Sequence, residues 1–239
     1  IFGSSAQITN TLFVGNSSFE GGAVYNTSNT KIINTTFTDN SADSGGAIYN
    51  RSSSPRIVNT ILWDNTTSSS DGEEIYNEDA TPTLSHSLIQ GGLASITEEG
   101  ESSTTDGGGN IDADPLFVDP SDPKGSDDLL GSRDDGLRVI DGSPVLDAGD
   151  NDALDTDGDG TRDLTTDVIL SGGSHPRVVK NDPSASTATV DIGAFEAPDT
   201  VLPVELTNFT VQRQSEANLL EWQTASEQNN AGFEIQRRV

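Results

Sequence analysis

The chain of 239 residues contains neither cysteine nor methionine, and it has few basic residues. Without cysteine, disulfides, thiolate metal sites and thiol catalysis are excluded. No apolar run approaches the roughly 18 residues that a membrane-spanning helix needs, so no membrane span is expected. Twelve basic residues stand against 39 acidic ones, which gives a net charge of −27. Nucleic-acid binding is excluded because no basic stripe is present to contact phosphates.

The core-forming residues are also sparse. Hydrophobic residues make up 31% of the chain and aromatic residues 5%, whereas glycine occurs 24 times. This composition fits a disordered chain or an all-β protein with many turns and a thin core. Acidic side chains are concentrated in residues 71–200, where 30 acids and six bases account for 24 of the 27 net charges. That concentration predicts a cation-binding or strongly hydrated region.

Three successive segments near the N-terminus are similar to one another. They read ITNTLFVGN…GGAVYN, IINTTFTDN…GGAIYN and IVNTILWDN…GEEIYN, and a degraded fourth copy reads LSHSLIQGG. The recurring positions are an asparagine column (Asn10, Asn34, Asn59), an apolar column (Phe13, Phe37, Leu62, then Leu88), a second asparagine column (Asn16, Asn40, Asn65) and a tyrosine column (Tyr25, Tyr49, Tyr76). A period of this length indicates a solenoid, a propeller or an array.

The β-branched runs within each repeat are short, and glycine, asparagine or serine turns separate them. Helical repeats need longer segments with a 3.6-residue period, and a propeller blade needs roughly 40 residues. Each repeat therefore predicts one coil of a right-handed parallel β-helix, an all-β fold with coils about 4.8 Å apart. Stacked isoleucines and phenylalanines should fill the interior, while asparagines bond to their copies at the turns. The glycine pairs at 21–22 and 45–46 should supply the positive φ of a corner.

The pairing of GGA-[IV]-Y-N with F-x-x-N, over roughly residues 8–92, resembles the repeats of chlamydial polymorphic outer-membrane proteins and related bacterial surface β-helices. The resemblance implies the β-helix fold and display at the cell surface. We interpret residues 1–112 as coils of this solenoid. The first coil has no evident cap, so we expect further coils upstream.

A second set of motifs lies in the acidic part of the chain. They are ADPLFVD at 113–119, DGSPVLDAGD at 141–150 and VDIGAFE at 190–196. In this order they resemble the choice-of-anchor Q domain, a module found after β-helical coils in bacterial surface proteins. The resemblance implies surface display and no catalysis. We therefore expect residues 113–197 to form acidic terminal coils, whose last turns bring Asp147, Asp150 and Asp191 together.

Within this part, the segment DTDGDGTRDLTTD at 155–167 has the spacing of a calcium loop. Calcium takes six to eight oxygen ligands, and alternate aspartates around a glycine turn wrap oxygens about one point. The predicted ligands are Asp155, Asp157, Asp159, the Thr161 carbonyl, Asp163 and Asp167. Thr166 replaces the acid expected at position 12 and no helices flank the loop, so it resembles a dockerin-like or thrombospondin-type loop. Calcium would be a structural cofactor here; the alternative is a hydrated Asp-Gly turn.

The C-terminal residues 202–239 alternate apolar and polar side chains with period 2. This pattern predicts strands around Val204/Leu206, Leu220/Trp222 and Phe233/Ile235. The sequence LPVELTNF…LLEWQTASEQNNAGFEIQRR resembles the fibronectin-III-like segment that precedes the sorting domain in proteins exported by the type IX system of Bacteroidota-type bacteria. We interpret residues 198–239 as a linker and the first strands of a fibronectin-III-like β-sandwich, and we expect type IX export.

Catalytic signatures are weak. No nucleophile elbow is present, and the two histidines have no metal-ligand spacing. Parallel β-helices also host polysaccharide lyases and hydrolases, which need a base beside acids or two converging carboxylates. The repeats offer Lys31, Arg51 and Arg56, which do not share a repeat column, and Asp39 and Asp64, which share a turn. No catalytic residue is assigned.

The tyrosine column, Tyr25, Tyr49 and Tyr76, is expected to face outward or to lie at a corner. Aromatic rings repeated at steps of about 5 Å could stack sugar rings. The alternative is that the three rings stack on one another and cover the sheet.

These observations predict a non-catalytic, secreted, cell-surface or extracellular-matrix β-helix that acts as a stalk, an adhesin or a polysaccharide-binding module, with calcium-stabilised terminal coils. Its expected partners are a polysaccharide or a cell-surface or matrix component. Two alternatives stay open. One is a calcium-dependent polysaccharide lyase or hydrolase, and the other is a filament or sheath subunit that self-assembles through unpaired edges.

Overall fold

The computed structural model describes residues 6–68, 72–132, 134–168, 176–179, 188–197, 206–213 and 218–224. The chain divides into two compact units, Ile1–Ala197 and Pro198–Val239, and each is considered by itself. The described residues form short strands, turns and three short 3-10 helices.

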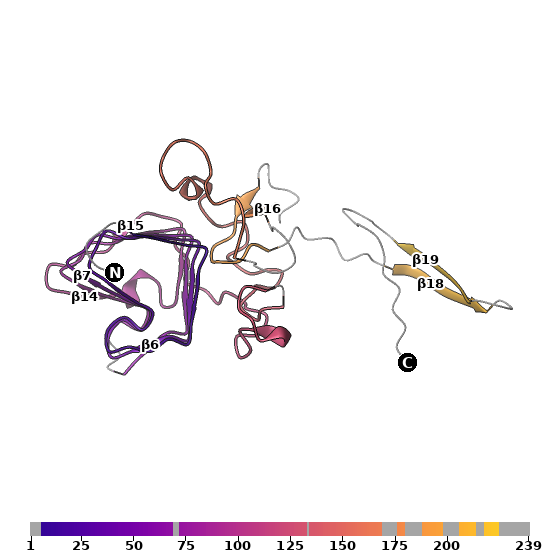
Figure 1. Ribbon diagram of the computed structural model, residues 1–239, viewed down its shortest axis with the longest axis horizontal. Helices are drawn as coiled ribbons and strands as arrows, with labels where there is room; N and C mark the ends of the chain where they lie inside the picture. The colour runs from indigo at the N-terminus through magenta and orange to yellow at the C-terminus, as the bar shows by residue number, and fades with distance from the viewer. Residues whose placement is uncertain are drawn as a thin grey trace. The chain divides into compact units, whose positions relative to one another are not determined.

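The first unit begins with a parallel β-solenoid of about four coils, in which three sheets run along the stack (Figure 1). The first sheet contains β1 (Gln7–Thr9), β4 (Lys31–Ile33), β8 (Arg56–Val58), β12 (Thr83–Ser85) and β15 (Thr105–Asp106). The second contains β2 (Leu12–Val14), β5 (Thr36–Thr38), β9 (Ile61–Trp63) and β13 (Leu88–Ile89). The third contains β3 (Val24–Asn26), β7 (Ile48–Arg51), β11 (Ile75–Glu78) and β14 (Thr97–Glu99). The expected all-β parallel β-helix is confirmed.

A short corner sheet and a turn of 3-10 helix complete the coils. Strand β6 (Ser41–Ala42) pairs with β10 (Thr66–Thr67) between the second and third sheets. Helix η1 (Leu93–Ser95) precedes β14 in the last coil. All of these inter-coil pairs are parallel and in register, so equivalent residues of successive repeats lie one above the other.

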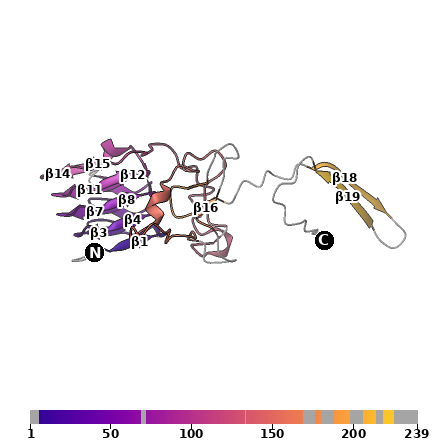
Figure 2. The ribbon, with the colours of Figure 1, turned by 90° about the horizontal axis from the view of Figure 1, so that it is seen from above.

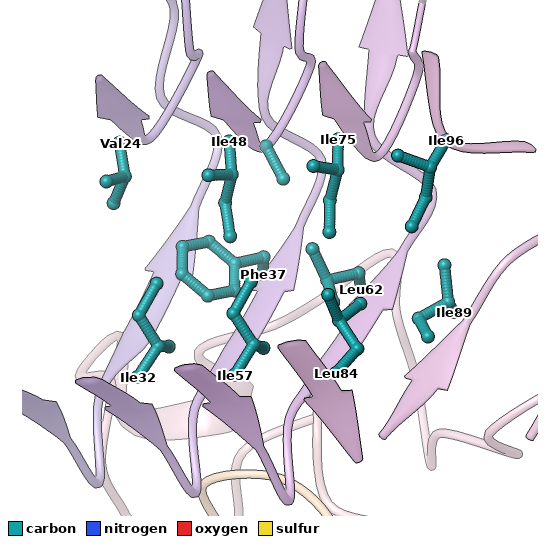
Figure 3. Close-up of a cluster of buried hydrophobic side chains, with 11 residues drawn as sticks. Val24, Ile32, Phe37, Ile48, Ile57, Leu62, Ile75, Leu84, Ile89 and Ile96 are labelled. Atoms are coloured by element: carbon teal, nitrogen blue, oxygen red, sulfur yellow. The ribbon is translucent and has the colours of Figure 1, made fainter. Parts of the chain in front are cut away.

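The interior of the solenoid is filled by columns of apolar side chains, one residue from each coil (Figure 3). The columns are Val24–Ile48–Ile75–Ile96, Ile32–Ile57–Leu84 and Phe37–Leu62–Ile89. The rings of Phe13 and Phe37 stack with their centroids 4.8 Å apart, which is the spacing between neighbouring strands. Burying one such side chain contributes about 1.5–3 kcal/mol, so the columns hold the coils together.

The apolar column continues through Ile89 in the fourth coil. Ile89 lies opposite Leu62, whereas Leu88 pairs with Ile61 on the outward side. The expectation that Leu88 continues this column is therefore wrong by one residue. The cause is the degraded repeat, in which His86 occupies the place of the first asparagine column.

That column forms the corner between the first and second sheets. Asn10, Asn34 and Asn59 have φ values of 48°, 51° and 50°, and His86 has 44°. Asparagine tolerates this left-handed conformation better than most residues, which explains its recurrence here. The glycine pairs close another corner, where Gly21 adopts a φ of 62° as expected.

The second glycine of each pair has a different purpose. A Cβ atom built on Gly22 would lie 2.1 Å from the carbonyl oxygen of Gly46 in the next coil. A side chain at this position would therefore separate the coils.

Asparagine side chains connect successive coils through hydrogen bonds, as the sequence predicts. In the column of Asn16, Asn40 and Asn65, Asn16 Nδ2 donates to Asn40 Oδ1 at 2.9 Å and Asn40 Nδ2 donates to Asn65 Oδ1 at 2.8 Å. The ladder ends where Asn65 Nδ2 donates to the buried carboxyl of Glu74 at 2.6 Å. The two bonds between asparagines therefore both run from an earlier coil to a later one.

A second ladder has the same polarity. Asn26 Nδ2 donates to Asn50 Oδ1 at 3.1 Å, and Asn50 Nδ2 donates to Asn77 Oδ1 at 2.9 Å. Glu98 replaces asparagine in the last coil and accepts from Asn77 Nδ2 at 3.5 Å. Both ladders thus end on a glutamate.

The described residues of the segment 113–197 differ from the expected terminal coils, because they pack along the side of the stack and not on its end (Figures 1 and 2). Hydrogen bonds join this block to three successive coils, through Asn10 Nδ2 and Thr166 O (2.8 Å), Lys31 Nζ and Thr156 O (2.7 Å), and Asn59 Nδ2 and Asp150 O (3.0 Å). The described part of the block contains η2 (Gly125–Asp127), η3 (Asn151–Leu154) and an antiparallel pair, β16 (Val178–Val179) with β17 (Thr189–Val190).

The lateral placement has a physical cause in the outward face of the second sheet. Ile61 and Leu88 point away from the solenoid interior but are 2% and 0% exposed, because Val145 and Ile192 of the block cover them. Without the block, these side chains would form an apolar patch on the surface. The block therefore completes a second core outside the coils.

In the second unit, the described residues form an antiparallel hairpin of β18 (Leu206–Arg213) and β19 (Asn218–Thr224). These strands include two of the three predicted strand positions, Leu206 and Leu220/Trp222. The third, Phe233/Ile235, lies outside the described residues.

Candidate functional site

The three aspartates at positions 1, 3 and 5 of the predicted calcium loop lie together. Asp155, Asp157 and Asp159 each offer one carboxylate oxygen, and these oxygens lie within 4.8 Å of one another. The backbone N–H groups of Gly160 and Gly158 donate to Asp155 Oδ2 and Oδ1 at 2.8 and 2.7 Å. These two bonds lower the pKa of Asp155, which favours its charged form. Converging carboxylates of this kind fit a hard, oxygen-preferring cation.

The other predicted ligands have different surroundings. The N–H of Thr161 donates to Asp159 Oδ1 at 2.7 Å, so its backbone lies beside the group. Asp163 Oδ2 accepts from the hydroxyl and the N–H of Thr156 at 2.6 and 2.8 Å, and these bonds lower its pKa. Asp167 is buried within the block, where its Oδ2 accepts from the N–H of Glu196 at 3.3 Å. The structure thus places Asp167 in a separate hydrogen-bond network, outside the cluster formed by Asp155, Asp157 and Asp159.

That network surrounds an arginine that the sequence analysis missed. Arg177 has no exposed surface, and its guanidinium donates to the carbonyl oxygens of Ala194 (2.6 Å), Asp191 (3.2 Å) and Gly193. Its Nε lies 4.0 Å from Glu196 Oε2, and the charges of Asp191 and Asp167 also favour the guanidinium. Arg177 lies outside the three recognised motifs, so no sequence pattern connected it to VDIGAFE.

A second group of carboxylates was also missed. Asp127, Asp134 and Asp135 offer oxygens within 4.8 Å of one another. Hydrogen bonds from the hydroxyls of Ser126 and Ser132 lower the pKa of Asp134 to about 2. These aspartates come from two separate turns, so their proximity follows from the fold of the block and not from a local spacing.

The predicted tyrosine column is a stack of rings. The ring centroids of Tyr25 and Tyr49 are 5.4 Å apart, and those of Tyr49 and Tyr76 are 4.9 Å apart. The hydroxyl of Tyr49 donates to Glu78 Oε2 at 2.8 Å, and that of Tyr76 donates to Glu99. The rings therefore cover one another between coils, as the ring-stacking alternative predicts. Sugar stacking on this column stays a prediction for the outermost rings.

Two basic residues share a column on the first sheet, contrary to the expectation from the sequence. Lys31 lies opposite Arg56 in the neighbouring strands β4 and β8. Lys31 Nζ donates to the Thr156 carbonyl at 2.7 Å, and Arg56 Nη2 lies 3.8 Å from Asp150 Oδ2. Both side chains therefore contact the acidic block.

The two acids expected to share a turn do so. Asp39 and Asp64 each have a φ of 56°, and Gly15 occupies the same turn of the first coil with a φ of 66°. Aspartate tolerates this left-handed conformation, which gives both residues a structural reason to be there.

Residues 34–51 match the family model of the Chlamydia polymorphic membrane protein repeat. This segment runs from the corner asparagine through β5, β6 and the glycine pair to the end of β7, which is most of one coil. No curated protein and no solved structure matches the chain. The match and the solenoid together fit a surface-exposed β-helix protein. Among the described residues, the helices are too short to cross a membrane.

Proposed function

We propose that the chain is a non-catalytic part of a secreted bacterial surface protein, in which the β-helix serves as a polysaccharide-binding or adhesive module. The observation that carries the proposal is the match of residues 34–51 to a surface-protein repeat, in a coil whose columns recur in the neighbouring coils. A stack of such coils presents parallel rows of polar side chains, which suits binding of extended ligands. Type IX export belongs to the same proposal and is supported by the resemblance of residues 202–239.

Calcium is proposed as a structural cofactor of the acidic block. Three carboxylates that converge in one loop repel one another unless a cation lies between them. The loop also contacts the solenoid, because the Thr156 carbonyl accepts from Lys31 of the second coil. An ion held by Asp155, Asp157 and Asp159 would therefore order the loop and strengthen the attachment of the block.

The binding proposal is tested with a panel of immobilised polysaccharides, in calcium and in chelator, scored for retention and for newly formed reducing or unsaturated ends. Retention without cleavage supports the proposal, and its loss in chelator connects the acidic block with binding. New ends would favour the lyase or hydrolase alternative. A species much larger than the monomer in size-exclusion chromatography would favour the filament alternative.

The calcium proposal has a separate test. Wild-type protein should show a calcium-induced rise in melting temperature, and the double variant Asp157→Ala/Asp159→Ala should lose it. Asp141→Ala is the matched control, because Asp141 is an exposed acid of the same block outside both carboxylate groups. An equal rise in the wild type and the double variant would refute the assignment of this loop.

A further inference from the structure

We infer that a groove along the corner sheet β6–β10 is the binding site for a neutral polysaccharide chain. The inference deepens the proposed function by naming its site and ligand class. The groove has a volume of about 360 Å³, and most of its lining residues carry hydroxyl groups: Ser17, Ser18, Ser41, Thr66, Thr67 and Ser68. Asp43 contributes a carboxylate to the same wall.

The hydroxyl groups form rows because the coils are in register. Ser17 pairs with Ser41, and Ser41 pairs with Thr66, which makes one row of three hydroxyl side chains along the stack. Neighbouring strands lie about 4.8 Å apart, a step comparable with the length of one sugar unit in an extended chain. A polysaccharide lying along the groove would therefore meet a hydroxyl group at each coil.

An exposed aromatic residue is the chain neighbour of a groove residue. Phe19 follows Ser18 in the chain and is 73% exposed, the highest value among the large hydrophobic residues described as exposed. Its carbonyl oxygen accepts the N–H of Asp43 at 3.0 Å, so Phe19 stands in the column of Asp43 one coil earlier. An exposed aromatic face beside polar groups suits the apolar face of a sugar ring, since an aromatic side chain offers a large and rigid contact.

The polar groups of the wall can accept and donate further hydrogen bonds. Asp43 Oδ1 accepts from the hydroxyl of Ser68 at 2.7 Å, and a carboxylate has about four lone-pair sites in all. Thr67 also lines the groove, but its Oγ1 is buried and out of reach of a ligand. Sugar hydroxyls both donate and accept, so they match this mixed wall.

The charge of the protein selects the kind of polysaccharide. The chain carries a net charge of −27, and the groove adds the carboxylate of Asp43 without any basic lining residue in its described wall. An acidic polysaccharide would meet repulsion from this field, which is strongest at low salt. The groove therefore fits a neutral chain better than a uronate-rich or sulfated one.

The test is affinity electrophoresis of the full chain in gels containing a neutral glucan, a mannan, alginate or polygalacturonate. We expect the neutral gels to retard the wild type and Phe19→Ala and Asp43→Asn each to weaken retention about threefold to tenfold, the range of one lost stacking or hydrogen-bonding contact. Leu129→Ala and Asp39→Asn are matched controls, an exposed apolar residue and an exposed acid elsewhere. Melting temperatures of all four variants verify that they fold.

The outcomes of this experiment distinguish the assignment of the groove from polysaccharide binding by the chain in general. The inference is supported if a neutral glycan retards the wild type and both controls but no longer retards the two groove variants. Equal retardation of all variants overturns the groove and leaves polysaccharide binding in place. Retardation by acidic glycans alone overturns the ligand class, and no retardation in any gel overturns both the groove and polysaccharide binding.

Discussion

Glu74 accepts the hydrogen bond that ends an asparagine ladder, from Asn65 Nδ2 at 2.6 Å. The side chain is 1% exposed and stands where the two preceding coils have Ala23 and Ala47. The pKa of Glu74 is raised to about 8, chiefly by burial and to a smaller extent by the nearby charges of Asp64 and Glu73, while the bonds from Asn65 oppose the rise. Glu74 is therefore neutral in the folded protein at neutral pH.

This relationship predicts a pH dependence of stability. A carboxyl group whose pKa is higher in the folded state than its unfolded value near 4.5 favours the folded state at low pH and loses this advantage as the pH rises to about 8. Each pKa unit corresponds to about 1.4 kcal/mol, so the loss should reach a few kcal/mol. Glu74→Gln keeps an acceptor for Asn65 but cannot ionise.

The measurement is denaturant unfolding of wild type and Glu74→Gln between pH 5 and pH 9. Because many other acids titrate in both proteins, the difference between the two curves is the informative quantity. We expect the variant to gain stability relative to the wild type as the pH rises. Parallel curves would show that Glu74 does not carry this dependence.

Gly22→Ala should prevent normal stacking of the first two coils. The new Cβ would lie 2.1 Å from the Gly46 carbonyl oxygen and 2.8 Å from the backbone nitrogen and oxygen of Ser41, so relief would require the main chain itself to shift. We expect a loss of more than about 3 kcal/mol in the free energy of unfolding. The control is Gly142→Ala, which has a φ of 86° but open space around it, and it should cost only about 1–2 kcal/mol. Similar losses of unfolding free energy in the two variants would contradict the close approach of Gly22 to the Gly46 carbonyl group.

The corner asparagines should respond differently to replacement by glycine, which adopts the same left-handed conformation. Asn34 is fully buried, and neither Oδ1 nor Nδ2 has a partner among the residues described. Asn59 exchanges two hydrogen bonds with the backbone of Asp150, at 2.7 and 3.0 Å. Asn59→Gly should cost about 2 kcal/mol, whereas Asn34→Gly should cost at least about 1 kcal/mol less, because it removes an unsatisfied buried amide. Thermal unfolding of both variants decides this, and equal losses would count against it.

Arg177→Met should destabilise the acidic block. The change leaves buried carboxylates without their cation and three carbonyl groups without their donor, and breaking a buried ion pair costs about 3–5 kcal/mol. Hydrogen exchange should increase in residues 188–197, next to the guanidinium. Arg162→Met, at an exposed position of the same block, should change the unfolding free energy by less than about 0.5 kcal/mol. Unchanged exchange near Arg177 would contradict its central role.

The coils were predictable because their contacts obey the repeat. In-register parallel pairing places equivalent residues on top of one another, so the columns of Asn40, Phe37 and Tyr49 can be read directly from sequence similarity. The fourth coil shows the limit of this method. His86 adopts the corner conformation of the asparagines, but it is a different type of residue. Sequence similarity alone therefore did not fix the register of this coil, and it placed Leu88 in the apolar column.

The position of the acidic block was not predictable in this way. Asp155, Asp157 and Asp159 are close in sequence, and their proximity follows from a local turn. By contrast, the bond between Asn10 and Thr166 spans 156 positions, and no motif in either segment refers to the other. Lateral packing was decided by outward apolar side chains such as Ile61, which look like ordinary strand residues in the sequence.

The lateral block also changes how the molecule should respond to mechanical force. A solenoid pulled along its axis can open one coil at a time, because each coil is held mainly by its neighbours. Here the block is fastened to the first, second and third coils at once, through Asn10, Lys31 and Asn59. A force applied along the axis of the stack would be shared among these attachments. Opening a single coil would then require the block to detach from that coil or to shift relative to it. We expect this part of the chain to yield in one large step and not in a series of small ones.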